Sequence, residues 1–416
     1  MMKQPILAAK KRSKGIYLVL AALVVVGLAF ALLQIVAVAQ QAQKRTEIEQ
    51  VAQYAAEALG TIAARDMNLK AISNRAMIAN EMAIGQIIGF HTWYEMTRQT
   101  STNIAMVSAW IPYVNGVTMH IARLLNQLRQ PMRTGITSAI ALQQMVIRGL
   151  SGFQWAFHQA AWLSSIATAV DIVEGSEKDL EIRFLNHQTL LDAENLWLRM
   201  QTYSRNRNDQ KDYIRMVSDS RDPFSQRRTY RWVDFLNAEV YRAGGSEVSL
   251  HRSGNVVWQS LDTHQLHLDL WVTNAYLPLG GGASYLTEPL PTRRNTQGFG
   301  DSYQQNWTTS RATTRRSYRF PLQHRAPAYF RLQENGKPPQ ITLVVQEKVV
   351  ADEDTQTASA GPLWGVGRVE LYFQRPKRFW PRSDEQLEQA NLHNALWQVR
   401  PKNITEIERE LIGAQL

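Results

Sequence analysis

One short segment of the sequence combines residue types that bind metal ions. Asp262, His264, His267 and Asp269 lie close together along the chain, and carboxylates and imidazoles at such spacing are ligands that zinc accepts. The segment alternates as a β-strand does, so the first two side chains share one face and the last two share the other. Ligands on opposite faces do not converge on one ion. We therefore expect a solvated edge strand here and no metal site.

The motifs of common enzymes and cofactor-binding proteins are missing. The chain has no G-x-S-x-G elbow, no G-x-x-x-x-G-K-[ST] loop, no dinucleotide fingerprint and no H-E-x-x-H. It has no cysteine, which excludes thiolate metal sites, cysteine nucleophiles and disulfide bonds. The acidic run at 352–354 lacks the spaced ligands and the glycine of a calcium loop. We expect no enzymatic activity, no cofactor and no bound metal.

Two stretches interleave arginines with aromatic residues. This composition suits anionic backbones and acidic glycans, and it equally suits a β-surface on which arginine stems cover aromatic rings. The formal net charge of +10 is compatible with both interpretations. Because the chain is expected to be exported, we favour an anionic glycan or an acidic protein surface as the partner and expect no nucleic acid. The candidate anionic-ligand surface comprises Arg227, Arg228, Arg231, Arg315, Arg316 and Arg319.

An apolar run near the N-terminus predicts a membrane anchor. Residues 16–33 are apolar apart from one glycine, and residues 35–39 continue the run. At about 1.5 Å per residue, a helix over 16–39 spans a hydrocarbon core of about 30 Å. We therefore predict a transmembrane helix in contact with the lipid bilayer. Its representative anchor positions are Ile16, Leu20, Val24, Leu28, Leu32 and Ile35.

The charges that flank the run predict its orientation. Basic residues precede it, and the first acidic residue is Glu47. The positive-inside rule then leaves 1–15 in the cytoplasm and exports the rest. We expect a single-pass protein of the bacterial inner membrane, with most of the chain in the periplasm or outside the cell. Two alternatives stay open: signal-peptidase cleavage after Ala39, and prepilin-like cleavage after Gly15, although Leu20 replaces the glutamate usual in pilins.

Beyond the anchor the sequence pattern changes twice. Residues 40–220 carry apolar residues at helical spacing and predict a helical stalk or domain, divided into short segments by prolines and glycines and ending in a polar helix over 177–216. Residues 221–376 alternate in period two and predict a mainly antiparallel β domain. We interpret the glycines at 244–245, 254 and 280–282 as breaks between its strands. Residues 377–416 form a tail with a short helix. The expected fold class is therefore α+β.

The middle of the helical section has an unusual composition. Between Glu95 and Asp171 the chain contains no acidic residue, although it contains several arginines. Trp110, Trp155 and Trp162, together with many aliphatic residues, make this the most apolar part beyond the anchor. Glycines, prolines and arginines interrupt it too often for a second membrane span. We expect its helices to be buried on two sides, in a helical core or against a partner.

Both ends of the chain resemble a known family. The anchor leads into an alanine-rich helix at 50–59 and then into the segment NRAMIANEMAIGQ at 74–86; near the C-terminus, YFQRP at 372–376 precedes NLHNALWQVR at 391–400. This combination resembles the TadE/TadG-like proteins of bacterial Tad (Flp) pilus systems. The resemblance implies a membrane-anchored, minor-pilin-like accessory role in pilus assembly. It also implies other membrane proteins of the pilus or secretion assembly as partners.

The alanine-rich helix and the asparagine segment supply a candidate partner surface. Small side chains let helices approach closely, and amides can form hydrogen bonds between them. Two simpler interpretations are that this helix lies on its own domain, and that Asn74 caps a helix beginning at Arg75. The alternative functions are an exported, membrane-tethered binding protein or hydrolase unrelated to pili, and a pilin that polymerises through its N-terminal helix. The candidate partner residues are Ala55, Ala58, Asn74, Ala76, Met77 and Asn80.

Overall fold

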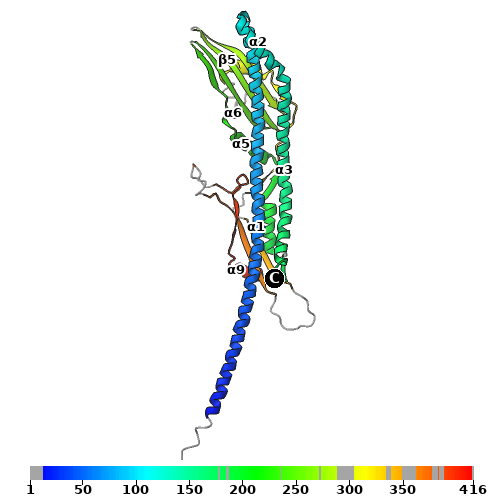
Figure 1. Ribbon diagram of the computed structural model, residues 1–416, viewed down its shortest axis with the longest axis vertical. Coiled ribbons are helices and arrows are strands. Elements are labelled where there is room, and N and C mark those ends of the chain that lie inside the picture. The colour runs from blue at the N-terminus through cyan, green and yellow to red at the C-terminus, as the bar shows by residue number, and fades with distance from the viewer. Residues whose placement is uncertain are drawn as a thin grey trace, which may run out of the picture.

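One long helix forms the spine of the molecule. The computed structural model describes residues 13–414 except 177–178, 184–186, 236, 271–272, 288–303, 334–338, 349–361, 377–382 and 384–387. Helix α1 (Ser13–Val107) is unbroken over 95 residues. Its N-terminal part projects alone, and its C-terminal part carries the folded body (Figure 1). The anchor helix therefore continues without interruption into the core.

The chain reverses at the far end of α1 and returns beside it. The reversal consists of the 3-10 turn η1 (Ser108–Trp110) and α2 (Pro112–Gln127), and the return is α3 (Arg129–Glu174). Pro112 is the first residue of α2, where its missing N–H leaves no hydrogen bond unmade. A break is present at Pro112, but the other prolines and glycines of 112–152 lie inside α2 or α3, so the prediction of many short helical segments was wrong. The glycines at 60, 85 and 89 lie inside α1, and those at 135, 149 and 152 lie inside α3.

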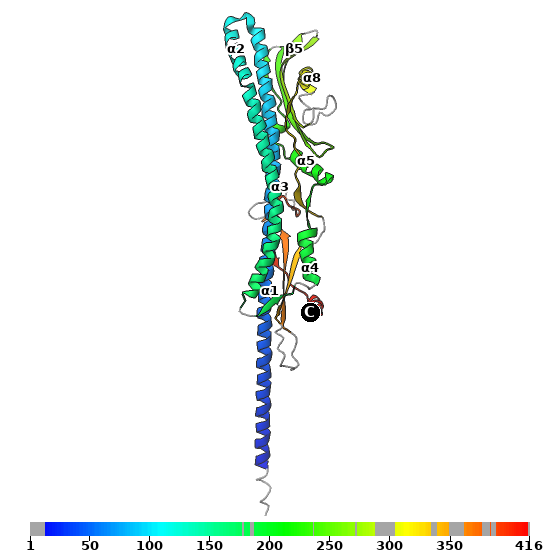
Figure 2. The ribbon, with the colours of Figure 1, turned by 90° about the vertical axis from the view of Figure 1, so that its right-hand side faces the viewer.

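Strands cover one side of this helical hairpin, as Figure 2 shows. The distal sheet has the order β3-β4-β5-β6-β7, with antiparallel pairs except for the parallel pair β6–β7. The proximal sheet, nearer the free part of α1, is antiparallel with the order β1-β9-β10-β11. The antiparallel pair β2–β8 is separate from both sheets. This arrangement confirms the α+β fold class.

The bounds of the strands follow the chain order. The distal sheet is built from β3 (Tyr230–Phe235), β4 (Ala238–Leu250), β5 (Val256–Leu270), β6 (Thr273–Leu286) and β7 (Tyr318–Phe320). The proximal sheet is built from β1 (Leu180–Ile182), β9 (Gln340–Glu347), β10 (Trp364–Phe373) and β11 (Trp397–Pro401). The separate pair consists of β2 (Gln201–Ser204) and β8 (Tyr329–Leu332).

Short helices connect these strands. They are α4 (His187–Glu194), the π-helix η2 (Asn195–Arg199), α5 (Arg207–Asp219), α6 (Pro223–Gln226), α8 (Trp307–Thr314) and α9 (Glu406–Gly413). The polar helix predicted over 177–216 was wrong, because β1 and β2 lie within it and pair with strands more than a hundred residues further along the chain. The tail contains the expected short helix, α9, and also β11, which completes the proximal sheet.

Two glycines explain how closely the sheets lie on α1. A Cβ atom at Gly282 in β6 would lie 2.0 Å from the carbonyl oxygen of Thr92, and one at Gly367 in β10 would lie 2.2 Å from that of Ala52. Only glycine permits such an approach of strand backbone to helix backbone. The glycines at 280–282 and 244–245 therefore lie inside strands and not in loops, contrary to the prediction. Gly254, with φ at +81°, does lie in the turn between β4 and β5.

Candidate interaction surfaces

The predicted anchor is the exposed N-terminal part of α1. Every described side chain from 17 to 46 is exposed, including Leu20, Val24, Leu28, Leu32 and Ile35, whereas Ile48 is fully buried. The side chain of Ile16 lies outside the described residues. Within the described chain, α1 is the one helix long and apolar enough to cross a membrane. An apolar helix with no protein neighbours matches the environment of a bilayer.

The predicted partner residues of α1 mostly face the chain itself. Ala55, Asn74 and Met77 are buried, so their assignment to a partner surface was wrong. The Asn74 amide donates to the carbonyl oxygens of Phe330 at 2.9 Å and Leu392 at 2.7 Å. Asn74 lies in the middle of a continuous helix and caps nothing. The helix lies on its own domain, which was the simpler interpretation.

The other three predicted partner residues are half-buried. They are Ala58, Ala76 and Asn80. The Asn80 amide donates to the carbonyl oxygen of Ala76 at 2.7 Å, which is a bond within α1. It therefore contributes no bond between helices. A partner has to be sought on another surface.

The outward sides of α2 and α3 form an exposed apolar surface, which we call the outer helical face. Large apolar side chains that are free of the body occur along both helices, and contiguous exposure of this kind marks interaction sites. The expectation of burial on two sides fails for these residues within the chain itself. The members of the outer helical face are Tyr113, Val114, Val117, Ile121, Leu124, Leu142, Met145, Phe153, Trp155, Leu163 and Ile166.

Small residues run between these large ones along α3. Gly152, Ala156, Ala160 and Ser164 recur every four residues, and all four are exposed. Nothing lies within 4 Å of a Cβ atom built at Gly152. Residues four apart lie on the same side of a helix, so a shallow strip borders the large apolar side chains. The outer helical face thus has the relief that another helix can fill.

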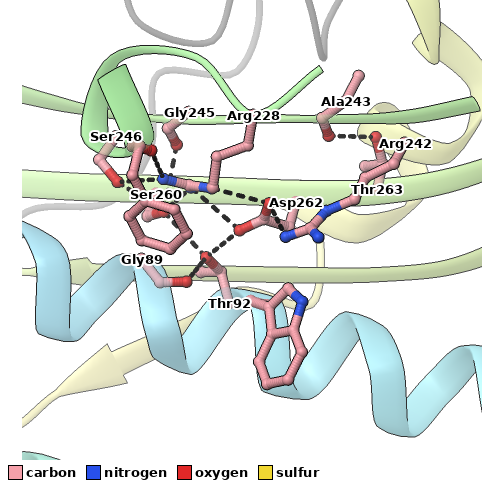
Figure 3. A network of polar contacts seen from close by, with 12 residues as sticks. Gly89, Thr92, Arg228, Arg242, Ala243, Gly245, Ser246, Ser260, Asp262 and Thr263 are labelled. Atoms are coloured by element: carbon pink, nitrogen blue, oxygen red, sulfur yellow. Dashed lines mark hydrogen bonds and ion pairs between the residues drawn. The ribbon is translucent and has the colours of Figure 1, made fainter. Parts of the chain in front are cut away.

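Arg228 was predicted to bind an external anion, but its side chain is buried and paired with a carboxylate of the protein itself. It is 4% exposed and forms a bidentate ion pair with Asp262, with distances of 2.9 Å between Nε and Oδ1 and 3.0 Å between Nη2 and Oδ2. Thr92 of α1 donates to the same carboxylate at 2.6 Å. Figure 3 shows these groups meeting between α1 and the distal sheet. The prediction that Arg228 belongs to the anionic-ligand surface was therefore wrong.

The residues of the apparent metal motif have separate roles. Asp262 is the counterion of Arg228, and His264 makes a contact of 3.1 Å between Nδ1 and the Thr100 hydroxyl of α1. His267 stacks on Tyr241 at 4.6 Å between ring centroids. The expected solvated edge strand was wrong, because β5 is the central strand of the distal sheet. The buried ion pair with Arg228 explains the presence of Asp262, for which the sequence pattern suggested no role other than metal binding.

The remaining predicted arginines are exposed and lie on different elements. Arg231 of β3 lies over the ring of Tyr241 at 5.1 Å and pairs with Asp234 at 3.3 Å. Arg227 precedes the buried Arg228. The pair at 315–316 follows α8, and Arg319 lies in β7. Of the six predicted arginines, Arg316 alone is among the described residues that line an arginine-rich cleft between α1, α3, β6 and α8.

This cleft, which we call the Glu95 cleft, is lined by four arginines. It has a volume of about 260 Å³ and lies between α1, the start of α3, β6 and α8. Three of the arginines share the carboxylate of Glu95: the shortest distances are 2.9 Å from Arg98, 2.9 Å from Arg129 and 3.0 Å from Arg133. Burial alone would raise the pKa of Glu95, but these guanidinium groups outweigh it and lower the pKa below its usual value.

A buried histidine lies behind the Glu95 cleft. His91 packs against the rings of Tyr318 and Phe320, and its Nε2 is 3.8 Å from a carboxylate oxygen of Glu95. Burial lowers its pKa to about 4, and the charges of Arg133 and Arg129 act in the same direction. His91 is therefore neutral at neutral pH and adds no charge to the cleft.

A second buried polar cluster joins α1, α3 and β2. Lys70 is fully buried, and its Nζ lies 2.6 Å from Asp66, 2.7 Å from His158 and 2.6 Å from Gln201. Burial lowers the pKa of Lys70 to about 8, although Asp66 opposes the shift. With 0% of Lys70 exposed, no substrate reaches the amine. The cluster fixes the register of three elements.

Comparisons with known proteins add no family to this description. No protein-family model, no curated protein and no solved structure matches the chain. The Glu95 cleft was missed from sequence because its arginines lie on α1, on α3 and on the turn after α8, which only the fold brings together. The signal available was the stretch between Glu95 and Asp171, which contains arginines and no acids.

Proposed function

We propose that this protein is a membrane-anchored accessory component of a cell-surface fibre or secretion assembly. It is of the minor-pilin-like kind that Tad (Flp) systems use, and it acts through protein–protein contacts and not by catalysis. The observation that carries this proposal is the continuity of α1, which is an exposed apolar segment at one end and the spine of the folded body at the other. The resemblance of the chain ends to TadE/TadG-like proteins supports the same role.

The proposed orientation places the N-terminus in the cytoplasm and the folded body in the periplasm or outside the cell. The basic residues that precede the anchor and the acidic residues that begin at Glu47 support it. In this orientation, the body is held at a fixed height above the inner membrane. A component with such a geometry positions partners relative to the bilayer.

The outer helical face is the surface proposed to contact those partners. The strands cover the opposite side of the helical hairpin (Figure 2). Leu163 is 70% exposed and Met145 is 69% exposed, and exposed apolar side chains in a contiguous patch are unfavourable unless a partner covers them. Their neighbours include Arg148 and no acidic residue, so an acidic or neutral helix is the fitting partner chemistry.

Affinity purification of the full chain from its host in an uncharged detergent tests the proposal. We expect other membrane proteins of the assembly to co-purify with the wild type. The double variant Met145→Glu/Leu163→Glu should lose them, because it introduces charges into the outer helical face. Ile407→Glu is the matched control, since Ile407 is 72% exposed on α9. Recovery of the wild type as an isolated monomer, with normal fibres in a deletion strain, would contradict the proposal.

Mass spectrometry of the mature N-terminus tests the anchor directly. We expect the purified membrane form to begin at Met1 or Met2 and to retain α1 in full. A mature protein that begins at Ile16 would instead support a polymerising pilin. One that begins at Gln40 would identify a released, exported protein and would rule out a permanent anchor.

A further inference from the structure

The Glu95 cleft holds more positive charge than its own acidic groups balance. Arg98, Arg129, Arg133 and Arg316 line it, and Glu95 is the single carboxylate among the described lining residues. The net charge of these groups is +3. Guanidinium groups gathered in one cleft repel each other. An anion bound among them would relieve it.

Two of the four arginines, Arg98 and Arg133, are held in place before any ligand arrives. Arg133 lies over the ring of Tyr318 at 4.1 Å, and Arg98 donates to the side-chain oxygen of Asn126 at 2.7 Å. Both side chains are mostly buried, with 17% of Arg98 and 18% of Arg133 exposed. Side chains that are already ordered lose little conformational entropy on binding. The cleft is therefore a built site and not a chance gathering of mobile surface arginines.

The backbone of β6 forms one wall of the cleft. Gly280, Gly281 and Gly282 line it, and the N–H of Gly281 donates to the side-chain oxygen of Gln99 at 3.0 Å. Thr309 and Thr313 of α8 also line the cleft, beside the turn that carries Arg316. Small residues and hydroxyls leave room for a compact, hydrated anion. The one aromatic ring among the described lining residues is that of Tyr318, and Arg133 lies over its face.

We propose that the Glu95 cleft binds a ligand through a phosphate or pyrophosphate group. Guanidinium groups pair with phosphate through two parallel hydrogen bonds, and several of them can surround its oxygens at once. A carboxylate has two oxygens on one side and one charge, and Glu95 already fills that role for three arginines. The residual charge of the cleft calls for an anion with two or more charges. This inference rests on the cleft itself, and the exclusion of bilayer headgroups as the source of the phosphate rests also on the proposed membrane anchor.

The position of the cleft limits the source of the phosphate. Glu95 lies 56 residues beyond Ala39 in the same helix, which corresponds to roughly 80 Å of helix. A headgroup of the bilayer that holds the anchor does not reach it when α1 stands upright. The phosphate or pyrophosphate group therefore belongs to a ligand of the surrounding compartment, either a small soluble molecule or a phosphorylated glycan.

Calorimetric titration of the full chain in an uncharged detergent tests the assignment. The probes are sodium pyrophosphate, glucose 1-phosphate and, as the carboxylate control, sodium acetate, all at one ionic strength. We expect pyrophosphate and glucose 1-phosphate to bind at least about tenfold more tightly than acetate, which corresponds to about 1.4 kcal/mol. The ratio of the two phosphate affinities distinguishes a bare phosphate site from one that also contacts the sugar. Absence of phosphate binding, or equal binding of acetate, overturns the proposal.

Variants on both sides of the cleft locate the binding. Arg316→Gln should weaken pyrophosphate binding about tenfold or more, because it removes a charge-assisted hydrogen bond to the anion. Arg316 is exposed on a turn, so this variant keeps the fold. Arg129→Gln should act similarly, and its thermal unfolding reports whether the fold is intact. Arg123→Gln is the matched control on the exposed side of α2. Equal weakening in the control would show non-specific attraction and overturn the assignment.

Discussion

Two arginine-rich sites lie against the distal half of α1, and they differ in how far their positive charge is balanced by carboxylates. At Asp262, the guanidinium groups of Arg228 and Arg242 meet one carboxylate in a site closed to solvent, with both arginines 5% exposed or less. At Glu95, three arginines meet one carboxylate and a fourth stands nearby, in a cleft open to solvent. In the closed site, the hydrogen-bonding groups of Arg228 are taken up by the protein itself. In the open site, positive charge remains in excess.

The difference follows from desolvation. A charge removed from water must be paired and fully hydrogen-bonded, or the folded state loses several kcal/mol. Arg228 meets this demand, since it also donates to the Ser260 hydroxyl at 2.8 Å and to the carbonyl oxygen of Phe224 at 2.7 Å. Solvent can hydrate the excess charge at Glu95, so the fold tolerates it. Burial separates a structural ion pair from a candidate binding site made of the same residue types.

The largest effect is expected when the closed site loses its carboxylate. Asp262→Ala leaves Arg228 and Arg242 buried without a counterion, and should lower the free energy of unfolding by about 3–5 kcal/mol. Urea denaturation followed by tryptophan fluorescence measures this loss, with Trp258 buried in the same sheet. A loss below about 1 kcal/mol would place the pair in the class of weak surface ion pairs.

Acid should destabilise the folded body through the histidine behind the open site. The pKa of His91 is about 4 in the folded protein and 6.5 in the unfolded chain. As the pH falls below 6.5, the unfolded state takes up the proton first, so the stability present above pH 6.5 is lost as the pH approaches 4. This loss is on the order of 3 kcal/mol.

The variant His91→Phe should remove that part of the acid sensitivity. Phenylalanine keeps the ring contacts with Tyr318 and Phe320 and cannot be protonated. Urea midpoints at pH 7 and pH 4.5 should therefore lie closer together in the variant than in the wild type. His120→Phe, at an exposed position of α2, should leave the wild-type difference unchanged. Identical pH dependence in all three proteins would contradict the prediction.

Removal of the carboxylate from the open site should have an intermediate effect that anions reverse. Glu95→Gln leaves three arginines without their shared partner, and should reduce stability in dilute chloride by about 1.5–3 kcal/mol. Sodium phosphate should then raise the melting temperature of the variant more than that of the wild type at equal ionic strength. The opposite order would mean that Glu95, and not the excess charge, determines the response to anions.

The smallest effect is expected at an exposed ion pair. Asp212 and Arg215 of α5 are 3.2 Å apart, with side chains 44% and 71% exposed. Asp212→Ala should change the free energy of unfolding by less than about 0.5 kcal/mol, because water screens such pairs. The same urea titration that is used for Asp262→Ala measures it. A change comparable to that of Asp262→Ala would remove burial as the cause of the difference between sites.

The sequence alone predicted the features that depend on local pattern. The apolar run of the anchor, the fold class and the turn at Gly254 follow from composition, periodicity and the preferences of single residues. Gly282 was misplaced because a glycine required by close packing of a strand on a helix looks the same in the sequence as a glycine required by a turn. A sequence pattern shows which backbone conformations and contacts a residue allows, and the tertiary structure determines which of them occurs.

The candidate sites depend on contacts between distant residues, which pattern does not report. Arg228 was assigned to an exposed surface although it is paired with Asp262, 34 residues away. Asn74 was assigned to a partner although it bonds to Leu392, 318 residues away. For the Glu95 cleft, sequence provided the unusual acid-free stretch and one arginine, Arg316, but not their meeting. Which side chains stay exposed depends on the tertiary structure, so the interaction surfaces could not be predicted from the sequence pattern.

The continuity of α1 has a mechanical consequence. In the proposed orientation, a continuous helix that leaves the bilayer without a break makes the whole body a lever that pivots at the membrane. From Ala39 to Val107 the helix continues for 68 residues, or roughly 100 Å. A tilt of about 20°, ordinary for a membrane helix, would then sweep the α2 end through about 35 Å. Small changes in the tilt of the anchor are thus amplified into large displacements at the far end.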